Sequence, residues 1–299
     1  MKHIVKLLTA VLVLEFLVGC GGGGGGSSNP GGGGPNNGSD YNISQENYTL
    51  TYENSIGTAF IKVNNGTFLM GVDSSDGWTA PDEMQHAVNI TKPFYLGVYE
   101  VTKGEWKAIM GANSDPYPAF NNDKYPVTNI KYAQIQEFID KLNAKEKRTT
   151  PDRPKYRLPT EAEWEYVARE EGAKLTAWSF GNDIAKLEQY AQYNKTGTLV
   201  FARVGQKDPN SLGFYDIYGN AYEFVSDFYD VNYGLNSAQL ASVTDDPQGP
   251  VSGTKKVARG GSITTANPAD LRSARRVDLD IGDSYPNLGF RLALDAPAP

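Results

Sequence analysis

The sequence contains a single cysteine, Cys20, in a chain of 299 residues. One cysteine excludes an internal disulfide framework and any cysteine-rich zinc site, so the fold must be held by its hydrophobic core. Positive charge is also scarce, because 28 lysines and arginines stand against 35 aspartates and glutamates. Binding to nucleic acid needs clustered positive charge, and this acidic chain without a basic run therefore predicts no nucleic-acid partner.

The apolar run near the N-terminus, residues 7–18, is too short to span a membrane. Lys2 and Lys6 precede it, which is typical of a secretory signal peptide, although Glu15 weakens the apolar segment. The run ends in the letters LVGC, which resemble the lipobox of bacterial lipoproteins. We expect residues 1–19 to be removed and Cys20 to become a lipidated N-terminus, which would anchor the protein in the bacterial cell envelope, at the outer-membrane surface. A chance cysteine beside an apolar segment is the alternative.

A stretch of almost pure glycine, serine, asparagine and proline follows the cysteine up to residue 40. This composition is typical of a flexible tether, so residues 20–40 are interpreted as a spacer between the lipid and a folded domain. From residue 41 to residue 299 the composition is globular, with no second linker and no internal repeat. One domain is therefore predicted for residues 41–299.

Three helices are predicted from apolar spacing and caps. Residues 131–147 place Ile135, Phe138, Ile139 and Leu142 on one stripe. Residues 160–170 begin with threonine and glutamate in capping-box spacing, with Trp164, Val167 and Ala168 on the inner face, and a shorter helix with the same cap spacing runs from residue 102 to about 111. Short strands are expected at residues 60–63, 94–98 and 290–292. Few helices, short strands and long ordered loops indicate an α+β fold.

Seven sequence blocks in a fixed order resemble the formylglycine-generating-enzyme, or sulfatase-modifying-factor, family. The blocks extend across almost the whole globular part, and they include RLPTEAEWEYVAR at 157–169, LGFYDIYGNAYEFVSD at 212–227, RGGS at 259–262 and NLGFRL at 287–292. The resemblance implies the family's variant of the C-type lectin fold, a loop-rich α+β domain whose first and last strands lie close together. Read from the residues alone, Trp164 and Tyr166 are interpreted as packing residues, and GNAYEF as a turn into a strand.

The chemistry of the family's enzymes needs residues that this chain lacks. The resemblance implies that catalytic members bind copper through two cysteines shortly after the GGS, but residues 263–270 here read ITTANPAD. Hydroxyl groups do not supply the soft ligands that copper(I) requires. A related branch uses three histidines for iron, whereas only His86 stays after removal of the signal peptide, because His3 leaves with it. We therefore predict that the protein is not an enzyme; a divergent oxidase is the third and weakest hypothesis.

A calcium site is a further implication of the resemblance. The family often binds calcium in the block that reads DIYGNAYE here, through Asp216, Gly219, Ala221 and Glu223. Carboxylate and carbonyl oxygens are suitable ligands for this ion. The alternative is a metal-free turn held by hydrogen bonds of Glu223, so calcium is a possible cofactor and none is required.

The segment between the last two blocks, residues 263–287, uses a restricted set of amino acids. It contains no Lys, Glu, Gln, Trp, Met, Phe or His. Asparagine codons whose adenines were replaced at random never give Lys, Glu, Gln, Trp or Met. With the lipobox, this pattern resembles the variable lipoproteins that retroelements diversify in treponemes.

That second resemblance implies a ligand-binding receptor whose specificity varies. In it the fixed parts are buried, here Arg272, Ser273, Ala274, Gly289, Phe290 and Arg291, while the substituted side chains lie on an exposed face and bind an unknown protein or other macromolecule. The predicted contact residues, with Tyr285 as the main anchor, are Ile263, Thr264, Thr265, Asn267, Asp270, Arg275, Val277, Asp278, Asp280, Asp283, Ser284, Tyr285 and Asn287.

Two other interpretations of this segment stay open. Asp278, Asp280 and Asp283, next to Arg275 and Arg276, are interpreted as a solvated surface rather than an acid/base site. An inert connecting loop would instead suit an envelope-associated lipoprotein of the same fold with a scaffolding or protein-assembly role. Loops of this length without secondary structure are uncommon unless they are functional, which favours ligand binding.

Overall fold

In the computed structural model, the described part of the chain is residues 51–296 apart from 74–76, 78–79, 119–121, 196 and 198–200. The chain divides into two units, Met1–Tyr41 and Asn42–Pro299, and every described residue belongs to the second. The predicted signal peptide, Cys20 and the tether lie outside the described residues. No helix in the described ranges is both long enough and apolar enough to cross a membrane.

The three predicted helices are confirmed. They are α1 (Lys103–Met110), α2 (Tyr132–Lys145) and α3 (Glu161–Ala168). In α1 and α3 a threonine caps the helix, and its hydroxyl accepts a hydrogen bond from the backbone amide of the glutamate three residues later. The side chain of that glutamate accepts a hydrogen bond from the threonine amide. The expected inner face of α3 is buried, and so is the stripe on α2, which consists of Ile135, Phe138, Ile139 and Leu142. The shorter helical elements are η1 (Ile184–Lys186), α4 (Leu187–Tyr190), α5 (Ser237–Leu240) and η2 (Pro268–Leu271).

A five-stranded sheet joins the two ends of the described chain. Its order is β1-β2-β5-β14-β6, with antiparallel neighbours throughout. The first strand, β1, and the last, β14, belong to this one sheet with β2 and β5 between them, so the N- and C-terminal strands of the described chain lie close together, as the resemblance implied. The strands are β1 (Thr51–Glu53), β2 (Ala59–Val63), β5 (Phe94–Gly97), β6 (Tyr156–Arg157) and β14 (Ala293–Asp295).

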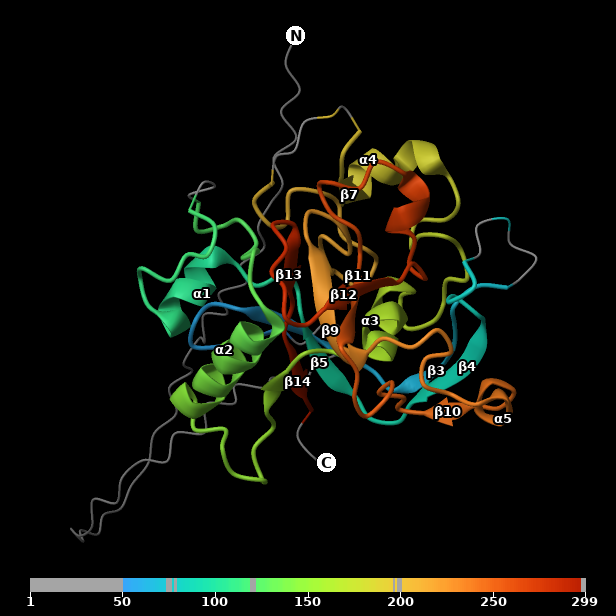
Figure 1. Cartoon of the computed structure of the whole chain (residues 1–299), viewed down its shortest axis with the longest axis horizontal. Helices are drawn as coiled ribbons and strands as arrows, with labels where there is room; N and C mark the ends of the chain where they lie inside the picture. The colour runs from blue at the N-terminus through green and yellow to red at the C-terminus, as the bar shows by residue number, and fades with distance from the viewer. Residues whose placement is uncertain are drawn as a thin grey trace, which may run out of the picture. The chain divides into compact units, whose positions relative to one another are not determined.

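A second sheet, of four strands, includes one strand from the segment with the restricted alphabet. Its order is β12-β11-β9-β13, so β12 is an edge strand, and β13 runs parallel to β9. In Figure 1 this sheet lies between α1 and α2 on one side and α3 on the other. The strands are β9 (Tyr222–Phe228), β11 (Lys255–Arg259), β12 (Val277–Asp280) and β13 (Leu288–Phe290).

The remaining strands form two small sheets. One has the order β10-β4-β3, and the other pairs β7 with β8. In Figure 1, β3, β4 and β10 lie together beside the short helix α5. Their bounds are β3 (Gly66–Met70), β4 (His86–Ile90), β7 (Ala191–Gln192), β8 (Tyr218–Gly219) and β10 (Thr244–Asp245).

One predicted strand is wrong in its position. The strand expected at residues 290–292 is instead the junction between β13, which ends at Phe290, and β14, which begins at Ala293. The chain changes sheets here, since β13 pairs with β9 and β14 pairs with β5. The side chain of Arg291 turns inward at the junction and binds Glu223 on β9. A short apolar run therefore indicated a strand but could not indicate that two sheets meet inside it.

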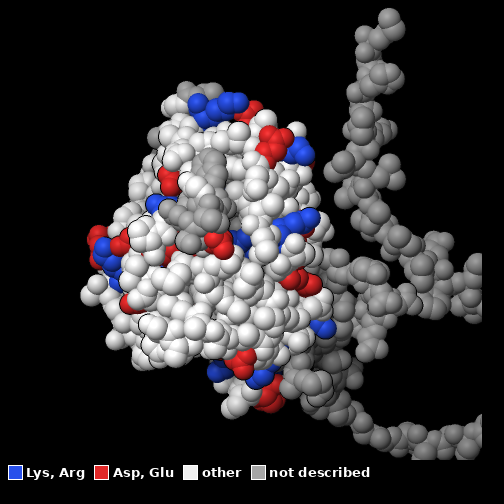
Figure 2. Space-filling view, turned by 90° about the vertical axis from the view of Figure 1, so that its right-hand side faces the viewer, with Lys and Arg blue, Asp and Glu red and all other residues white. Residues whose placement is uncertain are grey.

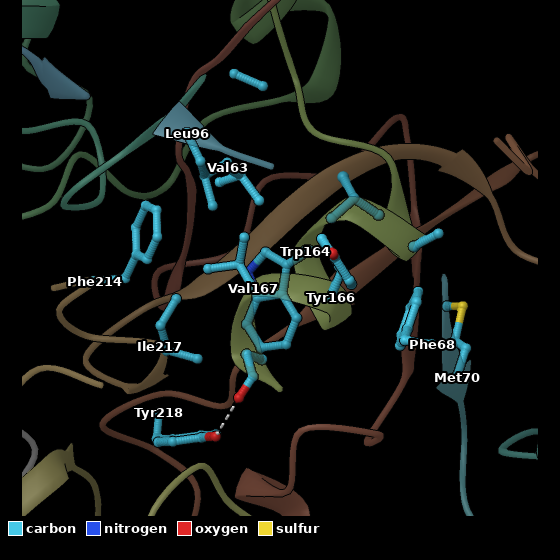
Figure 3. Close-up of a cluster of buried hydrophobic side chains, with 14 of the residues drawn as sticks. Val63, Phe68, Met70, Leu96, Trp164, Tyr166, Val167, Phe214, Ile217 and Tyr218 are labelled. Atoms are coloured by element: carbon cyan, nitrogen blue, oxygen red, sulfur yellow. Dashed lines mark hydrogen bonds between the residues drawn. The ribbon is translucent and has the colours of Figure 1, made fainter. Parts of the chain in front are cut away.

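The core has two main parts, one on each side of the four-stranded sheet. One part surrounds α3, where Trp164 and Val167 are fully buried among residues of β2, β3 and β5 (Figure 3). In the same view the Tyr218 hydroxyl donates a hydrogen bond to the Ala168 carbonyl at the end of the helix. The other part lies under α1 and α2, where Trp106 stacks on Phe138. The packing role predicted for Trp164 and Tyr166 is confirmed.

Figure 2 shows the side of the domain over β4 and α5, and most of this face carries no charged side chain. Lysine and arginine side chains are scattered there and are interspersed with aspartate and glutamate. No concentrated basic patch is visible on this face, so it offers no strong electrostatic attraction for a polyanion.

Candidate ligand-binding surface

The variable segment, residues 263–287, is held at both ends by glycines that tolerate no side chain. Gly260 and Gly261 have positive φ angles of 92° and 78°, and a Cβ on Gly261 would lie 2.3 Å from a methyl group of Leu271. At the other end, a Cβ on Gly289 would lie 2.4 Å from the carbonyl oxygen of Val127. Close packing therefore fixes where the segment leaves the core and where it returns.

Four buried arginines fasten the segment and its flanks to other elements. Each forms an ion pair with a buried glutamate from elsewhere in the sequence, and Arg272 and Arg276 bind both oxygens of theirs. Two-point pairing between a guanidinium and a carboxylate fixes orientation as well as position. The pairs are Arg259 with Glu165, Arg272 with Glu83, Arg276 with Glu161, and Arg291 with Glu223.

The middle of the variable segment is buried along with its arginines. Ser273 and Ala274 are 1% exposed, and the Ser273 hydroxyl lies 2.8 Å from the Tyr218 hydroxyl. This is the burial expected for the fixed RSA block. Arg276, in contrast, was placed with the solvated acids, and that expectation was wrong, because its guanidinium also lies 3.8 Å from the centre of the buried Tyr233 ring. The buried stretch therefore extends from Arg272 to Arg276, interrupted only by the half-buried Arg275.

The variable segment is more regular than its sequence suggested. It contains η2, capped by the Asn267 side chain, which accepts a hydrogen bond from the Ala269 amide. It also contains β12, which pairs with β11 in antiparallel register from Val277 opposite Ala258 to Asp280 opposite Lys255. The segment is therefore partly a strand of the second sheet, and not a loop throughout.

The predicted contact residues differ in their exposure. Five are exposed at the surface and six are partly exposed, so eleven of the thirteen lie where a ligand can reach them. The exposed side chains are Thr264, Asn267, Asp280, Asp283 and Ser284, and the partly exposed ones are Asp270, Arg275, Val277, Asp278, Tyr285 and Asn287.

Two predicted contact residues are not on the surface. Ile263 is 4% exposed and packs against Phe201 and Ala221. Thr265 is 6% exposed, and its hydroxyl accepts a hydrogen bond from the Ser262 amide and donates one to the Tyr222 hydroxyl. Both expectations of exposure are corrected, because the turn after Ser262 directs these two side chains inward.

The accessible polar side chains are themselves partly ordered by one another. The Asn287 amide donates hydrogen bonds to the hydroxyls of Ser262 and Thr264, at 3.1 and 2.7 Å. Arg275 pairs with Asp270 at 3.0 Å. These contacts hold exposed side chains in place before any ligand arrives, which reduces the entropy lost on binding.

Apolar side chains outside the predicted set adjoin this surface. Tyr132 on α2 and Tyr222 on β9 are partly exposed, and so is Leu279 on β12. Leu279 is paired across the sheet with Lys256, whose ammonium lies 4.9 Å from the centre of the Tyr132 ring. The sequence carried no signal for the two tyrosines, because Tyr132 and Tyr222 precede the segment by 131 and 41 residues in the chain. Only the fold brings them beside it.

The predicted calcium residues surround an arginine. The two oxygens of Glu223 accept hydrogen bonds from Arg291, at 2.6 and 2.7 Å, and one also accepts from the Trp164 indole at 2.8 Å. One oxygen of Asp216 accepts from the Gly205 amide at 2.6 Å. Gly219 and Ala221 lie in and after the turn that leads into β9, as the sequence predicted. The charge of Glu223 is thus already balanced by the Arg291 guanidinium, whereas Asp216 accepts from a backbone amide.

A third buried carboxylate, Glu100, completes this cluster. It accepts hydrogen bonds from the Asn220 side chain and the Ala221 amide, each at 2.8 Å. Burial and the nearby charges of Asp216 and Glu223 raise the pKa of Glu100 well above its usual range. Burial also raises the pKa of Asp216 to about 6. Across the described ranges, no three His, Cys, Asp or Glu side chains are grouped in a way that would hold a metal ion.

Comparison with known proteins relates the whole described domain to one family. Residues 45–296 match the model of the sulfatase-modifying factor enzyme 1-like domain. The formylglycine-generating enzyme of Bos taurus is 36% identical over an alignment of 152 positions, which covers 46% of this chain and 39% of that enzyme. The chaperone protein LppX of Paenibacillus barcinonensis is 25% identical over an alignment of 237 positions, which covers 64% of this chain and 77% of that protein. The chain thus aligns with well under half of the bovine enzyme.

Solved structures agree with the fold. PvdO from Pseudomonas aeruginosa superposes with a TM-score of 0.71 at 24% identity, over 84% of this chain and all of that one. Treponema denticola variable protein 1 superposes with a TM-score of 0.69 at 27% identity, also over 84% of this chain and all of that one. The resemblance and the α+β fold class predicted from the sequence are confirmed.

Proposed function

The chain belongs to the family of sulfatase-modifying factor enzyme 1-like domains. We propose that it is a ligand-binding receptor without catalytic activity. The surface of the variable segment is its binding site. The ligand is a protein or another macromolecule.

One observation carries this proposal, namely the separation of fixed and free positions within a single segment. Arg272 and Arg276 are buried and paired, while Asp280, Asp283 and Ser284 are exposed a few residues away. Substitutions at the exposed positions cost the core little, since these side chains make few contacts with it. A segment built in this way can change its binding specificity without losing its fold.

The absence of catalysis is supported by the residues at the start of the segment. Residues 263–270 contain no thiol, so they supply no soft ligand for copper. Asp270 pairs with Arg275, and the Thr265 hydroxyl is occupied by Ser262 and Tyr222. Asp270 and Thr265 are thus engaged in structural contacts and are not available as a base or a nucleophile.

Likeness to Treponema denticola variable protein 1 supports the further proposal that a retroelement diversifies the segment. The restricted alphabet of residues 263–287 supports it independently. With the lipobox at Cys20, the proposal is a lipid-anchored protein of the bacterial envelope, displayed on the outer-membrane surface by the tether of residues 20–40.

The gene's DNA tests diversification. We expect a nearby near-copy of the last hundred or so bases that differs from the gene only where the copy has adenine. Substitutions spread evenly over all four bases would overturn this part of the proposal.

Binding is tested by exchange of the exposed positions. A chain in which Thr264, Asn267, Asp280, Asp283 and Ser284 are replaced together by residues from a diversified copy should bind a different set of proteins in a surface-protein array. It should lose no more than about 2 kcal/mol of unfolding free energy, because Asn267 caps η2 and Thr264 accepts a hydrogen bond from Asn287. An unchanged set of bound proteins would contradict the proposed site, and a larger loss of stability would show that the positions serve the fold.

A second candidate function is a role in protein assembly in the envelope. The alignment with the chaperone protein LppX favours it. A chaperone would recognise partners through fixed residues, so exchange of the five exposed positions would leave its partners unchanged. The same array experiment therefore separates the two functions.

A further inference from the structure

The edge strand of the four-stranded sheet lies inside the variable segment. Strand β12 pairs with β11 on one side only, and no other described strand pairs with it. Its residues Val277, Asp278 and Leu279 are partly exposed, and Asp280 is exposed. An edge with unpaired peptide groups is a template for another strand, which proteins normally protect or use.

The register identifies which peptide groups point outward. The Ile281 amide bonds the Thr254 carbonyl, so these two residues form a hydrogen-bonded pair. In an antiparallel ladder, bonded and non-bonded pairs alternate, which places Asp280 opposite Lys255 and Asp278 opposite Val257 in non-bonded pairs. The peptide groups of Asp278 and Asp280 therefore point away from β11.

The pairing on the other side of β11 agrees with this assignment. The Lys255 carbonyl accepts a hydrogen bond from the Tyr229 amide, so the peptide groups of Lys255 point toward β9 and not toward β12. On the outer edge of β12, the Asp280 carbonyl accepts only from the Asp283 amide, at 3.3 Å. In this register the Asp278 amide and carbonyl and the Asp280 amide have no partner on β11, and no described strand lies on their other side.

The side chains of β12 specify what an added strand would carry. Val277 and Leu279 lie on one face, against the core cluster that includes Tyr132, and Asp278 and Asp280 lie on the other. On the inner side, Lys255 of β11 forms an ion pair with Asp278. Lys255 also lies opposite Asp280 and interacts with its charge, but no described cation forms an ion pair with Asp280 or Asp283. These two carboxylates can therefore be complemented by a cationic strand added outside β12.

We propose that the ligand adds an extended segment to the outer edge of β12, with apolar side chains beside Val277 and Leu279 and lysine or arginine beside Asp278 and Asp280. This inference rests on the proposed function and names the class of partner for this copy of the segment. Backbone hydrogen bonds do not depend on side-chain identity, so they persist when the segment is diversified, while the alternate side chains select the ligand.

The probe for this proposal is a fluorescein-labelled peptide of sequence KVKVKV, titrated by anisotropy into residues 20–299 carrying Cys20→Ala. A KKKVVV peptide of equal charge is the first control, and KVKVKV with N-methyl groups on alternate residues is the second. We expect each control to bind at least about fivefold more weakly, because alternation or a backbone donor is lost. Equal binding of the N-methylated peptide, or of KKKVVV, would overturn the proposal.

Two substitutions at one position separate backbone from charge on the protein side. Asp280→Pro removes the outward amide without touching a bond to β11, and Asp280→Asn removes the same charge while keeping the amide. Asp280→Pro should bind KVKVKV with an affinity about fivefold lower than that of Asp280→Asn, since one hydrogen bond is lost. Equal affinity of two folded variants would contradict an added strand. If Asp280→Pro does not fold, the binding of the N-methylated peptide to the chain with unchanged Asp280 tests the added strand instead.

Failure of this proposal is distinguishable from failure of the proposed function. If KVKVKV does not bind but exchange of the exposed positions changes the proteins bound, the site stands and the added strand is wrong. If exchange changes nothing, the proposed function itself is overturned.

Discussion

The guanidinium of Arg276 binds both carboxylate oxygens of Glu161, at 2.6 and 2.9 Å, and both side chains are buried. Arg276 immediately precedes β12, and Glu161 is the first residue of α3. The pair therefore fastens the variable segment to the central helix of the core.

Replacement of Arg276 tests that role. Arg276→Ala should lower the free energy of unfolding by about 3 kcal/mol, because it leaves the buried Glu161 carboxylate with only Arg259, 3.7 Å away. Arg275→Ala is the matched control, and its half-buried side chain should contribute no more than about 1 kcal/mol. Urea denaturation measures both values. Equal losses would mean that the two neighbours serve the fold alike.

The corrected position of Ile263 gives a second prediction. Ile263→Ala should cost about 2–4 kcal/mol of unfolding free energy, because it opens a cavity beside Phe201 and Ala221. Asp283→Ala, at an exposed position of the same segment, should stay within about 0.5 kcal/mol of the parent. A negligible effect of Ile263→Ala on the free energy of unfolding would show that the side chain is not packed in the core, and would support its original prediction as a contact residue.

Buried Asp227 predicts a pH dependence of stability. Burial and the neighbouring Glu161 raise the pKa of Asp227 to about 7. Its carboxyl therefore stays protonated in the folded chain while it ionises in the unfolded chain above about pH 4, so its contribution to stability falls as the pH rises from 4 to 7.

Asp227→Asn removes this titration and retains an acceptor for the Glu161 amide. Relative to the parent, the variant should gain at least about 1 kcal/mol between pH 4 and pH 8, as measured by urea denaturation at both values. A constant difference between the two chains would show that the carboxyl ionises normally in the folded state.

Calcium removal tests the turn before β9. We expect a chelator to leave the melting temperature unchanged, because Arg291 already balances the charge of Glu223. Calcium remains the implication of the family resemblance, and a melting temperature that falls with chelator and recovers with calcium but not magnesium would establish it. Glu223→Gln would then abolish the recovery.

Lipid anchoring is tested at Cys20, which lies outside the described residues. Expressed in bacteria, the parent chain should partition with membranes and into detergent, and Cys20→Ala should be released into the aqueous phase, because the acyl chains supply the membrane affinity. Membrane partitioning of the Cys20→Ala chain would refute the lipobox interpretation.

Local signals in the sequence determined the local elements well. The Thr102 and Thr160 caps gave the starts of α1 and α3, and the apolar stripe gave α2, because caps and periodicity depend only on near neighbours. The family blocks gave the fold class and the approximate limits of the exposed segment.

Long-range contacts decided what each residue of that segment does. Arg275 and Arg276 are identical in chemistry and adjacent, yet one is half-buried and the other is fully buried against Glu161. Likewise Thr264 is exposed and Thr265 is buried under Tyr222. The sequence around each pair of neighbours does not show which one is buried. The partner of Arg276, Glu161, lies 115 residues away in the chain, and the partner of Thr265, Tyr222, lies 43 residues away.

The sequence by itself thus determined the family resemblance, the α+β fold class, and the lack of thiols for the family's copper chemistry at residues 263–270. Only the tertiary structure decided that Arg276 is buried with Arg272, that Ile263 and Thr265 point inward, and that β12 is an open edge. Composition and spacing constrain what a residue can do, but burial and pairing are set by residues distant in the sequence.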